Sequence, residues 1–385
     1  MKNKQTIIFK MLFIATAVIL MGLSACKTST TPQPADCDLG YHQCEYDESI
    51  CCVDTTSHNF TWTIDIIGVF SAVLTDVSII SENDIWVIGD IYTNDTGYLK
   101  NENVAHWDGS EWTISSIEFL RSNGEHYSSV GECVKAFSTN DVWFVSSYGA
   151  LTHFDGSDYQ YYGFGSDQRF KNEIWGNSSD YFVLAGDSTI VHYNGNEFIQ
   201  YAPITNSSIY DLYGLDQNNI WAVSYNDALL SSYDNLVIHF DGQNWNELYR
   251  LNTEVLYPDS ISGIVEAIWA SGDTVYIPSS AGIWKKSING NGVLMRPQEM
   301  IDEGINYFTG TLIRGNNAND YFYGYWNGQI FHYNGIDWYY IPELAELQFT
   351  DPIRLFKMAQ KDNVVVFVGE QFSSGLGIII KGVRY

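Results

Sequence analysis

Positive charge is scarce in this sequence. The 385 residues include 19 lysines and arginines against 46 aspartates and glutamates, for a formal net charge of −27. Nucleic acids and anionic lipid surfaces are bound through clusters of basic residues, so this balance excludes both as electrostatic partners. Any membrane connection must therefore come from an anchor and not from surface charge.

The motifs of common enzyme and metal sites are absent as well. The sequence has no Gly-x-Ser-x-Gly, no His-Glu-x-x-His and no phosphate-binding loop, which disfavours the common hydrolase, zinc protease and nucleotide-binding classes. It also lacks an Asp-x-Asp-x-Asp-Gly loop of the kind that holds calcium. We therefore expect no cofactor and no metal, with Ca²⁺ the one ion that the acidic composition leaves open.

Long hydrophobic runs are limited to one, at the N-terminus. Three lysines precede the apolar run 11–23, and Ser24, Ala25 and Cys26 follow at once. This order is typical of a secretory signal peptide over residues 1–25, and its end resembles the lipobox of bacterial lipoproteins, which implies a lipid on Cys26. A transmembrane anchor is the alternative, but the run falls short of the roughly 20 residues that a span needs. Residues 26–36 then form a lipidated spacer, and we expect the protein in the cell envelope, at the outer membrane, on a side that stays open.

Cysteine is rare outside a short segment. Four of the six cysteines fall within residues 37–58, namely Cys37, Cys44, Cys51 and Cys52. In an oxidising compartment this density predicts two disulfides, whose three possible pairings the sequence leaves open. A vicinal bond is disfavoured by strain, and a metal held by the four thiols is the alternative. Cys133 is expected to be a buried thiol on an inner strand.

In place of these features the chain has a repeat. A turn rich in Ser, Thr and Asn leads into a strand that opens with Asp or Asn, and two mostly β-branched or aromatic residues follow. This signature occurs seven times, at Asp84-Ile85-Trp86, Asp141-Val142-Trp143, Asp180-Tyr181-Phe182, Asn219-Ile220-Trp221, Asp273-Thr274-Val275, Asp320-Tyr321-Phe322 and Asn363-Val364-Val365. Five copies continue into a strand that ends like His106-Trp107-Asp108-Gly109. Units of this kind cannot bury their apolar faces alone, so they must stack.

The turns and the spacing predict propeller blades. Asp-Gly or Asn-Gly between apolar runs indicates a hairpin, and we expect type I′ turns with positive φ at both central residues. Each unit then has four short antiparallel strands, and a repeat of about 40–50 residues is typical of a blade. The expected fold is all-β: a seven-bladed β-propeller over residues 59–385, preceded by the short disulfide-rich segment. The last unit lacks its outer strand, and we expect Asn59 to Thr63, with Trp62 at the aromatic position, to supply it and close the ring.

The signature resembles that of propeller lipoproteins of the Bacteroidota kind. It is also similar to the Asp-box, or BNR-like, repeats of sialidase-like propellers and to kelch-like repeats. The resemblance extends from Asn59 to Tyr385 and implies a propeller on a lipid anchor. The Asp box has one residue between its Asp and Gly where this sequence has none, and only seven arginines are available for a sialidase-like grip on a carboxylate. The resemblance therefore carries no catalytic residue across.

Binding is expected on one face of the propeller. In up-and-down blades the tight turns share one face, here named the turn face. The longer second-to-third and blade-to-blade connections share the other, here named the loop face, and variable loops on a rigid scaffold usually carry binding sites. The candidate ligand-binding residues are aromatic and basic residues in or beside these insertions: Tyr92, His126, Tyr127, Tyr225, Arg250, Tyr257 and Arg296. Packing of the tyrosines within their own loops is the alternative.

Residues that repeat with the fold are expected to be structural. Five of the eight histidines occupy one repeat position, which favours a structural role over catalysis. The aspartates that open the second strands are expected to form turns. An aromatic column just before the first turn, on the innermost strands, is expected to pack between blades, and lining of the central channel is the alternative. Its members are Phe137, Trp175, Tyr213 and Trp269.

Together these observations predict a lipid-anchored, non-catalytic propeller of the cell envelope. Its partner is expected to be a glycan or an envelope protein, or else the propeller serves as a scaffold. The alternative is a carbohydrate-active enzyme, a glycosidase or lyase, that uses loop-face carboxylates. Several carboxylates are available, although their spacing marks no pair: Glu118, Glu125, Asp259, Asp302 and Glu303.

Overall fold

The structure is a computed structural model, and the residues that it describes are almost entirely in β-strands. They are 41–44, 47–53, 55–94, 97–162, 173–186, 189–201, 208–226, 234–252, 265–279, 282–287, 290, 292–295, 311–344, 346 and 352–385. The chain divides into two units, Met1–Asp54 and Thr55–Tyr385. The first contains a hairpin of β1 (Tyr41–Cys44) and β2 (Asp47–Val53). Within these ranges no helix is long and apolar enough to cross a membrane.

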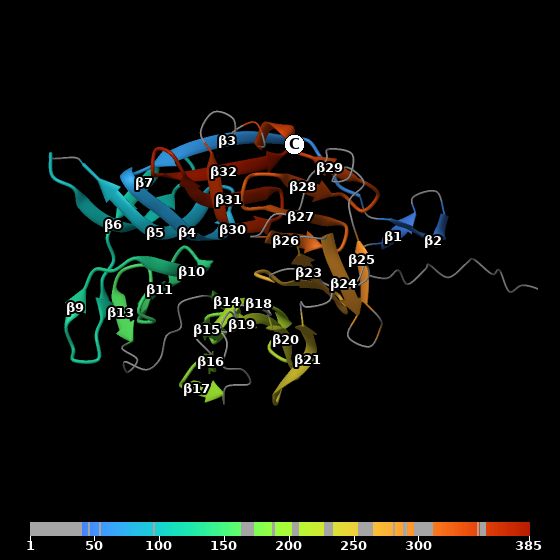
Figure 1. The fold of residues 1–385 in the computed structure, drawn as a ribbon, viewed down its shortest axis with the longest axis horizontal. Coiled ribbons are helices and arrows are strands. Elements are labelled where there is room, and N and C mark those ends of the chain that lie inside the picture. Colours follow the sequence, from blue (N-terminus) through green and yellow to red (C-terminus); the bar gives the residue numbers. More distant parts are fainter. Residues whose placement is uncertain are drawn as a thin grey trace, which may run out of the picture. The chain divides into compact units, whose positions relative to one another are not determined.

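The second unit is a seven-bladed β-propeller of four-stranded antiparallel blades, as the repeat predicts (Figure 1). From inner to outer strand, the first three blades are β4 (Val69–Ser81), β5 (Asp84–Thr93), β6 (Lys100–Trp107) and β7 (Trp112–Ser115); β10 (Gly131–Ser138), β11 (Asp141–Ser146), β12 (Leu151–Phe154) and β13 (Tyr159–Tyr162); and β14 (Glu173–Ser178), β15 (Tyr181–Gly186), β16 (Thr189–Tyr193) and β17 (Phe198–Tyr201). A hairpin of β8 (Phe119–Leu120) and β9 (His126–Tyr127) is inserted between the first two blades.

The remaining four blades follow the same order. They are β18 (Ser208–Asp216), β19 (Asn219–Asn226), β20 (Asp234–Phe240) and β21 (Trp245–Asn252); β22 (Trp269–Ser271), β23 (Thr274–Ser279), β24 (Gly282–Ser287) and β25 (Gly292–Met295); β26 (Thr311–Asn317), β27 (Asp320–Tyr325), β28 (Ile330–Tyr333) and β29 (Trp338–Tyr340); and β30 (Ile353–Lys361), β31 (Val364–Gln371), β32 (Leu376–Arg384) and β3 (Phe60–Ile67).

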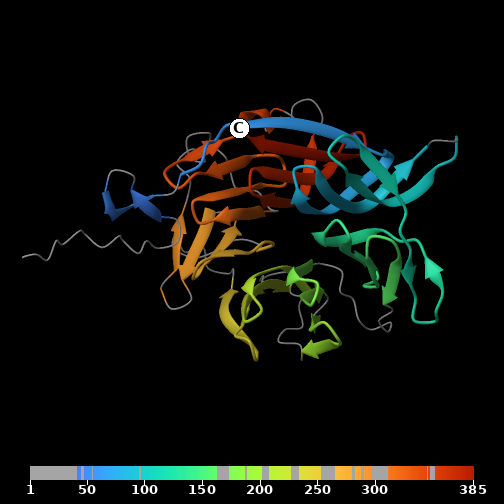
Figure 2. The same ribbon diagram turned by 180° about the vertical axis from the view of Figure 1, so that it is seen from behind.

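The ring is closed by the N-terminal strand, as expected. Strand β3 pairs antiparallel with β32 from Phe60 opposite Arg384 to Ile67 opposite Gly377, and the two strands run side by side in both views (Figures 1 and 2). The ring of Trp62 covers Gly382, where an added Cβ would lie 2.4 Å from an indole carbon. Because the first and last strands of the ring share one blade, unravelling either end would open the seventh blade.

The hairpin turns reverse the chain by a different geometry from the one expected. In the Asp-Gly and Asn-Gly turns only the glycine has a positive φ, for example +95° at Gly109, so these are not type I′ turns. The Asp108 carboxylate instead accepts hydrogen bonds from the backbone N–H groups of Ser110 and Glu111, at 2.8 and 3.0 Å. The acidic or amide side chain therefore organises a four-residue loop by binding its own backbone.

Strand pairing corrects the position of three copies of the signature. In the first blade Ser81 lies opposite Asp84, and the matching pairs in the third, fifth and seventh blades are Ser178 with Tyr181, Ser271 with Thr274 and Lys361 with Val364. Tyr181, Thr274 and Val364 therefore occupy the aspartate position, and Asp180, Asp273 and Asn363 lie one residue before it. The local pattern was misleading here because an Asp or Asn precedes the strand in all three blades.

Three of the five repeated histidines, His106, His153 and His332, hold the aspartate that opens the second strand of their blade. His106 lies 2.9 Å from the Asp84 carboxylate and His153 lies 2.8 Å from that of Asp141, and each imidazole stacks on the tryptophan of its own signature, with ring centroids 4.0 and 4.1 Å apart. The structural role expected for these histidines is confirmed. The aspartates do more than form turns, since they are hydrogen-bond partners across the blade.

The hydrophobic core is divided into layers between neighbouring blades. Trp175 packs on Gly214 of the next blade, and Trp269 packs on Gly315; a Cβ on either glycine would lie within 2.8 Å of the indole ring. Phe137 covers Gly176 in the same way. Phe137, Trp175 and Trp269 therefore pack between blades as predicted, and the glycine opposite each of these rings allows the inner strands to approach closely. Phe137, Trp175 and Tyr213 also line a cavity at the centre of the ring.

Candidate functional site

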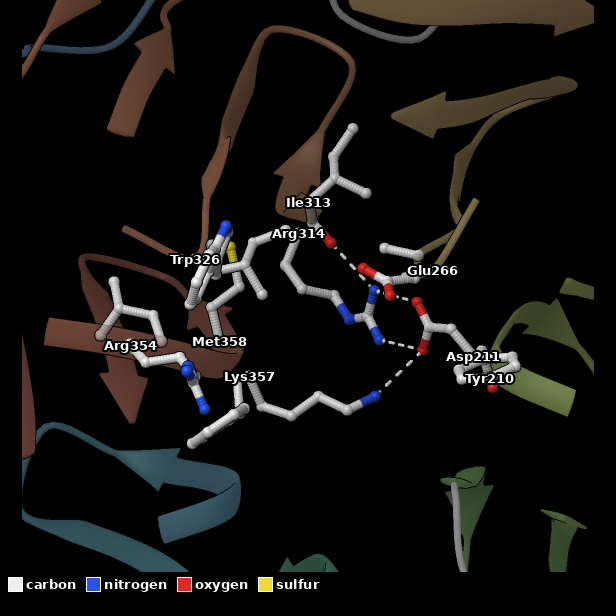
Figure 3. Close-up of a pocket in the computed structure, with 13 residues that line it drawn as sticks. Tyr210, Asp211, Glu266, Ile313, Arg314, Trp326, Arg354, Lys357 and Met358 are labelled. Carbon is white, nitrogen blue, oxygen red and sulfur yellow. Dashed lines mark hydrogen bonds and ion pairs between the residues drawn. The ribbon is translucent and has the colours of Figure 1, made fainter. Parts of the chain in front are cut away.

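Charged side chains from five inner strands meet in the centre of the propeller. Asp76 lies on β4, Glu173 on β14, Asp211 on β18, Arg314 on β26 and Lys357 on β30. Arg314 grips the Asp211 carboxylate with two nitrogens, at 2.7 and 3.0 Å, and the Lys357 ammonium lies 3.4 Å from the same group (Figure 3). Lys357 also contacts the Glu173 carboxyl closely. We name these residues, without Asp76, the central charge network.

The pKa values of the two carboxyl groups in the central charge network are shifted in opposite directions. Burial raises the pKa of Glu173 to about 8, in spite of the nearby Lys357. Burial acts in the same direction on Asp211, but Arg314 and Lys357, with hydrogen bonds to Arg314 and Glu173, hold its pKa well below the usual range. At neutral pH the network is therefore a charged Asp211 between two cations, with a largely neutral Glu173 beside it.

The inner-strand aspartates also connect neighbouring blades. Asp76 accepts a hydrogen bond from the backbone N–H of Val134 in the second blade at 2.8 Å, and Asp211 accepts one from Ile268 in the fifth at 2.8 Å. Both aspartates are buried. Each carboxylate thus replaces the water that would otherwise satisfy a backbone group at the channel wall.

A cavity of about 380 Å³ lies on the loop-face side of the network. Its walls are the first residues of β18, β26 and β30, and Trp326, in the turn after β27; the apolar part of the wall includes Leu312, Leu355 and Met358. The charged floor of the cavity is the Arg314–Asp211 pair (Figure 3). We name this space the loop-side cavity.

An arginine between two aromatic rings forms the rim of the loop-side cavity. The Arg354 guanidinium lies 4.9 Å from the ring centroid of Trp326 and 4.9 Å from that of Phe372, and Glu370 pairs with it at 3.2 Å. The Phe372 side chain is 62% exposed. The stack keeps the guanidinium in a fixed orientation beside the cavity, with an aromatic surface outside it.

A second cavity, of about 420 Å³, lies on the turn-face side. It is lined by the last residues of the inner strands and by two further cations, Lys135 and Lys361. Arg314, Lys357 and Met358 line both cavities, so the two spaces meet at the central charge network. We name this second space the turn-side cavity.

The site residues expected from the sequence lie elsewhere. Neither cavity is lined by any of the four whose side chains are described, Tyr92, His126, Tyr127 and Arg250. His126 lies 3.3 Å from Glu118, the Tyr127 hydroxyl is 3.1 Å from that of Ser146, and Arg250 pairs with Glu247 at 2.9 Å. Tyr92 pairs within the β4–β5–β6 sheet. These contacts are local, as in the alternative in which the loops pack on themselves.

For the remaining expected residues, the structure describes only part of the residue or none of it. Tyr257, Arg296, Cys26 and Cys37 are outside the described residues, as are the carboxylates Asp259, Asp302 and Glu303. Tyr225 is described by its backbone alone, at the end of β19. Cys51 is disulfide-bonded, and the pairing with Cys37, Cys44 and Cys52 stays a prediction. Cys133 is buried on β10, the inner strand of the second blade, as expected.

The central network was missed because its members are far apart in the sequence. The available signal was a charged residue between apolar residues within an inner strand, as at Asp211 and Lys357. The expected carboxylates that are described are both on the inserted hairpin or beside it, Glu118 with His126 and Glu125 with Arg121 at 3.7 Å. Among the described residues no cluster of His, Cys, Asp and Glu is placed to hold a metal ion.

Comparison with known proteins identifies the fold and leaves the ligand open. No protein-family model matches the chain, and no curated protein matches it. The chain is similar to the structure of YCF48 bound to D1 peptide, with a TM-score of 0.61 at 14% identity over 86% of this chain and 98% of that one. It is also similar to YCF48 from Cyanidioschyzon merolae (0.54, 12%, 83% and 98%) and to the WD40 propeller domain of Doa1 (0.52, 10%, 84% and 97%). At these identities the similarity establishes the propeller fold alone.

Proposed function

We propose that this protein is a non-catalytic binding propeller that holds a peptide segment of a protein partner at its loop face. The observation that carries the proposal is the loop-side cavity, whose volume of about 380 Å³ lies in the range of ligand sites. Its rim combines Trp326 and Arg354, and tryptophan and arginine are the side chains most enriched where binding energy concentrates.

The chemistry of the cavity suits a peptide. Apolar walls at Leu312, Leu355 and Met358 can take an apolar side chain, and the Arg354 guanidinium can donate hydrogen bonds to a backbone carbonyl or a carboxylate. Phe372 and Phe70, on the loop face, are 62% and 72% exposed, which adds apolar surface for a protein partner. A structurally similar propeller, YCF48, was solved with a D1 peptide bound, so a propeller of this fold can hold one.

The proposal also places the propeller on a lipid anchor. The signal-like segment 1–25 and the lipobox-like end before Cys26 support an anchored protein of the cell envelope, attached to the outer membrane by Cys26. Labelling cells with an alkyne fatty acid should mark the protein and leave a Cys26→Ser variant unmarked. An unmarked wild-type chain would contradict the anchor without affecting the peptide site.

The peptide site can be tested by selection from a random dodecapeptide phage library on the full chain purified in detergent. We expect enriched sequences that bind the wild-type protein and lose at least tenfold in affinity to Trp326→Ala and Arg354→Ala. The matched control is Tyr98→Ala, which removes an aromatic ring that is 81% exposed and lines neither cavity. Circular dichroism confirms that each variant is folded.

Three results would contradict this function: no enrichment, enriched peptides that bind all variants equally, or binding of an arrayed glycan that depends on Trp326 when no peptide binds. The last result would assign the cavity to a sugar.

A further inference from the structure

The turn-side cavity differs from the loop-side cavity in its chemistry. Six of the seven inner strands line it, namely β4, β10, β14, β18, β26 and β30. Its volume of about 420 Å³ can hold a small organic anion together with water. It shares Arg314, Lys357 and Met358 with the loop-side cavity, and its other lining residues are its own.

Two lysines in this cavity have no ion-pair partner among the residues that the structure describes. Lys135 is partly buried on β10, and within the part of the chain that the structure describes its ammonium makes no ion pair or hydrogen bond; the Phe137 ring lies 5.7 Å away. Lys361, at the exposed end of β30, likewise has no ion pair among the described residues. Burial lowers the pKa of Lys135, and the nearby Asp76 and Glu173 offset this only in part, so a bound anion would stabilise the charged form of the lysine.

The balance of charge in the cavity is positive. Four cations line it, Lys135, Arg314, Lys357 and Lys361, against the lining carboxyl groups of Asp76 and Glu173 and the Asp211 carboxylate that pairs with Arg314 and Lys357. Burial raises the pKa of both lining carboxyls, that of Glu173 to about 8, so Glu173 carries little negative charge near neutral pH. The sign of the charge in this cavity is opposite to that of the whole chain, whose net charge is −27.

We propose that the turn-side cavity binds a small multivalent oxyanion, a polycarboxylate or a phosphate, between Lys135 and Lys361. An anion at this position supplies the acceptors that the two ammonium groups lack, and Arg314 and Lys357 add to the positive potential from the floor. Because the chain as a whole is negative, a positive cavity is a distinctive position for an anion. The site is independent of the peptide site, because its two lysines line only the turn-side cavity.

Isothermal titration calorimetry of the full chain in detergent tests this site, with citrate and pyrophosphate as the probes at one fixed ionic strength. Wild-type protein should bind at least one of them with a saturable heat at one site per chain. Lys135→Met keeps the aliphatic stem and removes the charge, and it should weaken binding at least tenfold, as should Lys361→Gln at the exposed mouth. The control is Lys381→Met, whose ammonium stacks on the Trp107 ring at 4.2 Å and lines neither cavity.

The outcomes separate this site from the peptide site. Lys135→Met should keep its affinity for a selected peptide, and Trp326→Ala should keep its affinity for the anion. The absence of saturable heat from both anions, or wild-type affinity in both Lys135→Met and Lys361→Gln, would overturn the proposal. Equal weakening in Lys381→Met would show that general surface charge causes the signal, and would overturn it as well.

Discussion

Removal of the Asp211 charge is expected to be among the most damaging single changes in the channel. The side chain is fully buried, and its carboxylate accepts from Arg314 at 2.7 and 3.0 Å and from the backbone N–H of Ile268 at 2.8 Å, with Lys357 3.4 Å away. Asp211→Leu would leave two partly buried cations with Glu173 as the one remaining carboxyl group of the central charge network. It would also leave a backbone donor without an acceptor.

The size of the effect follows from the cost of breaking a buried pair. Removing one partner costs about 3–5 kcal/mol, which for a domain of this size lowers Tm by about 4–7 °C. Arg314→Met should cost less, because Lys357 still neutralises Asp211. The double variant Asp211→Leu/Arg314→Met should be more stable than the sum of the two single changes predicts, since neither charge remains to be compensated.

Scanning calorimetry of the four proteins measures this cycle. Glu247→Leu is the matched control, because Glu247 forms an exposed pair with Arg250 at 2.9 Å and its loss should cost no more than about 1 kcal/mol. A Tm for Asp211→Leu within 1 °C of wild type, or strict additivity in the double variant, would refute the view that the network is a coupled unit.

Three further changes test other parts of the structure. Burial raises the pKa of Glu173 to about 8, so the folded state keeps this proton longer than the unfolded chain; stability should fall as pH rises from about 5 to 8, and Glu173→Gln should flatten that slope in urea titrations. Gly214→Ala should lower stability by about 1–3 kcal/mol, because its Cβ would lie 2.6 Å from the Trp175 ring, and Trp175→Leu in the same chain should restore part of the loss in thermal melts. Asp141→Ala should cost about 1–2 kcal/mol in the urea midpoint by removing the acceptor 2.8 Å from His153, whereas an unchanged midpoint would mean that the repeated pair contributes nothing.

The architecture could be predicted because short local sequence patterns indicate its strands and turns. The Asp-Gly and Asn-Gly turns mark hairpins between strands. Trp62 marks an outer strand near the N-terminus, and this strand completes a blade only if it pairs with the C-terminal strand and closes the ring. The turn type could not be predicted from the dipeptide, because Asp-Gly is also compatible with a loop in which the Asp108 carboxylate accepts a hydrogen bond from the Ser110 backbone N–H. The register at Tyr181 and Thr274 needed the pairing partner, since an adjacent Asp imitates the signature.

The site could not be predicted in the same way, because it exists only when the ring closes. Asp211, Arg314 and Lys357 are each a single charge in a separate inner strand, and no spacing rule connects positions that lie in three different blades. The tyrosine-rich insertions were more prominent in the sequence. In the structure Tyr127 contacts Ser146 and Arg121, so its prominence reflects packing of the inserted hairpin on the second blade.

Hydrogen–deuterium exchange on the full chain, with and without a selected peptide, tests most directly whether the loop-side cavity is the binding site. With the peptide bound, we expect slower exchange at the start of β26 and β30 and in the turn that contains Trp326, and unchanged exchange in the β8–β9 hairpin. Slower exchange confined to that hairpin, around His126 and Tyr127, would contradict this expectation and move the site to the inserted loop.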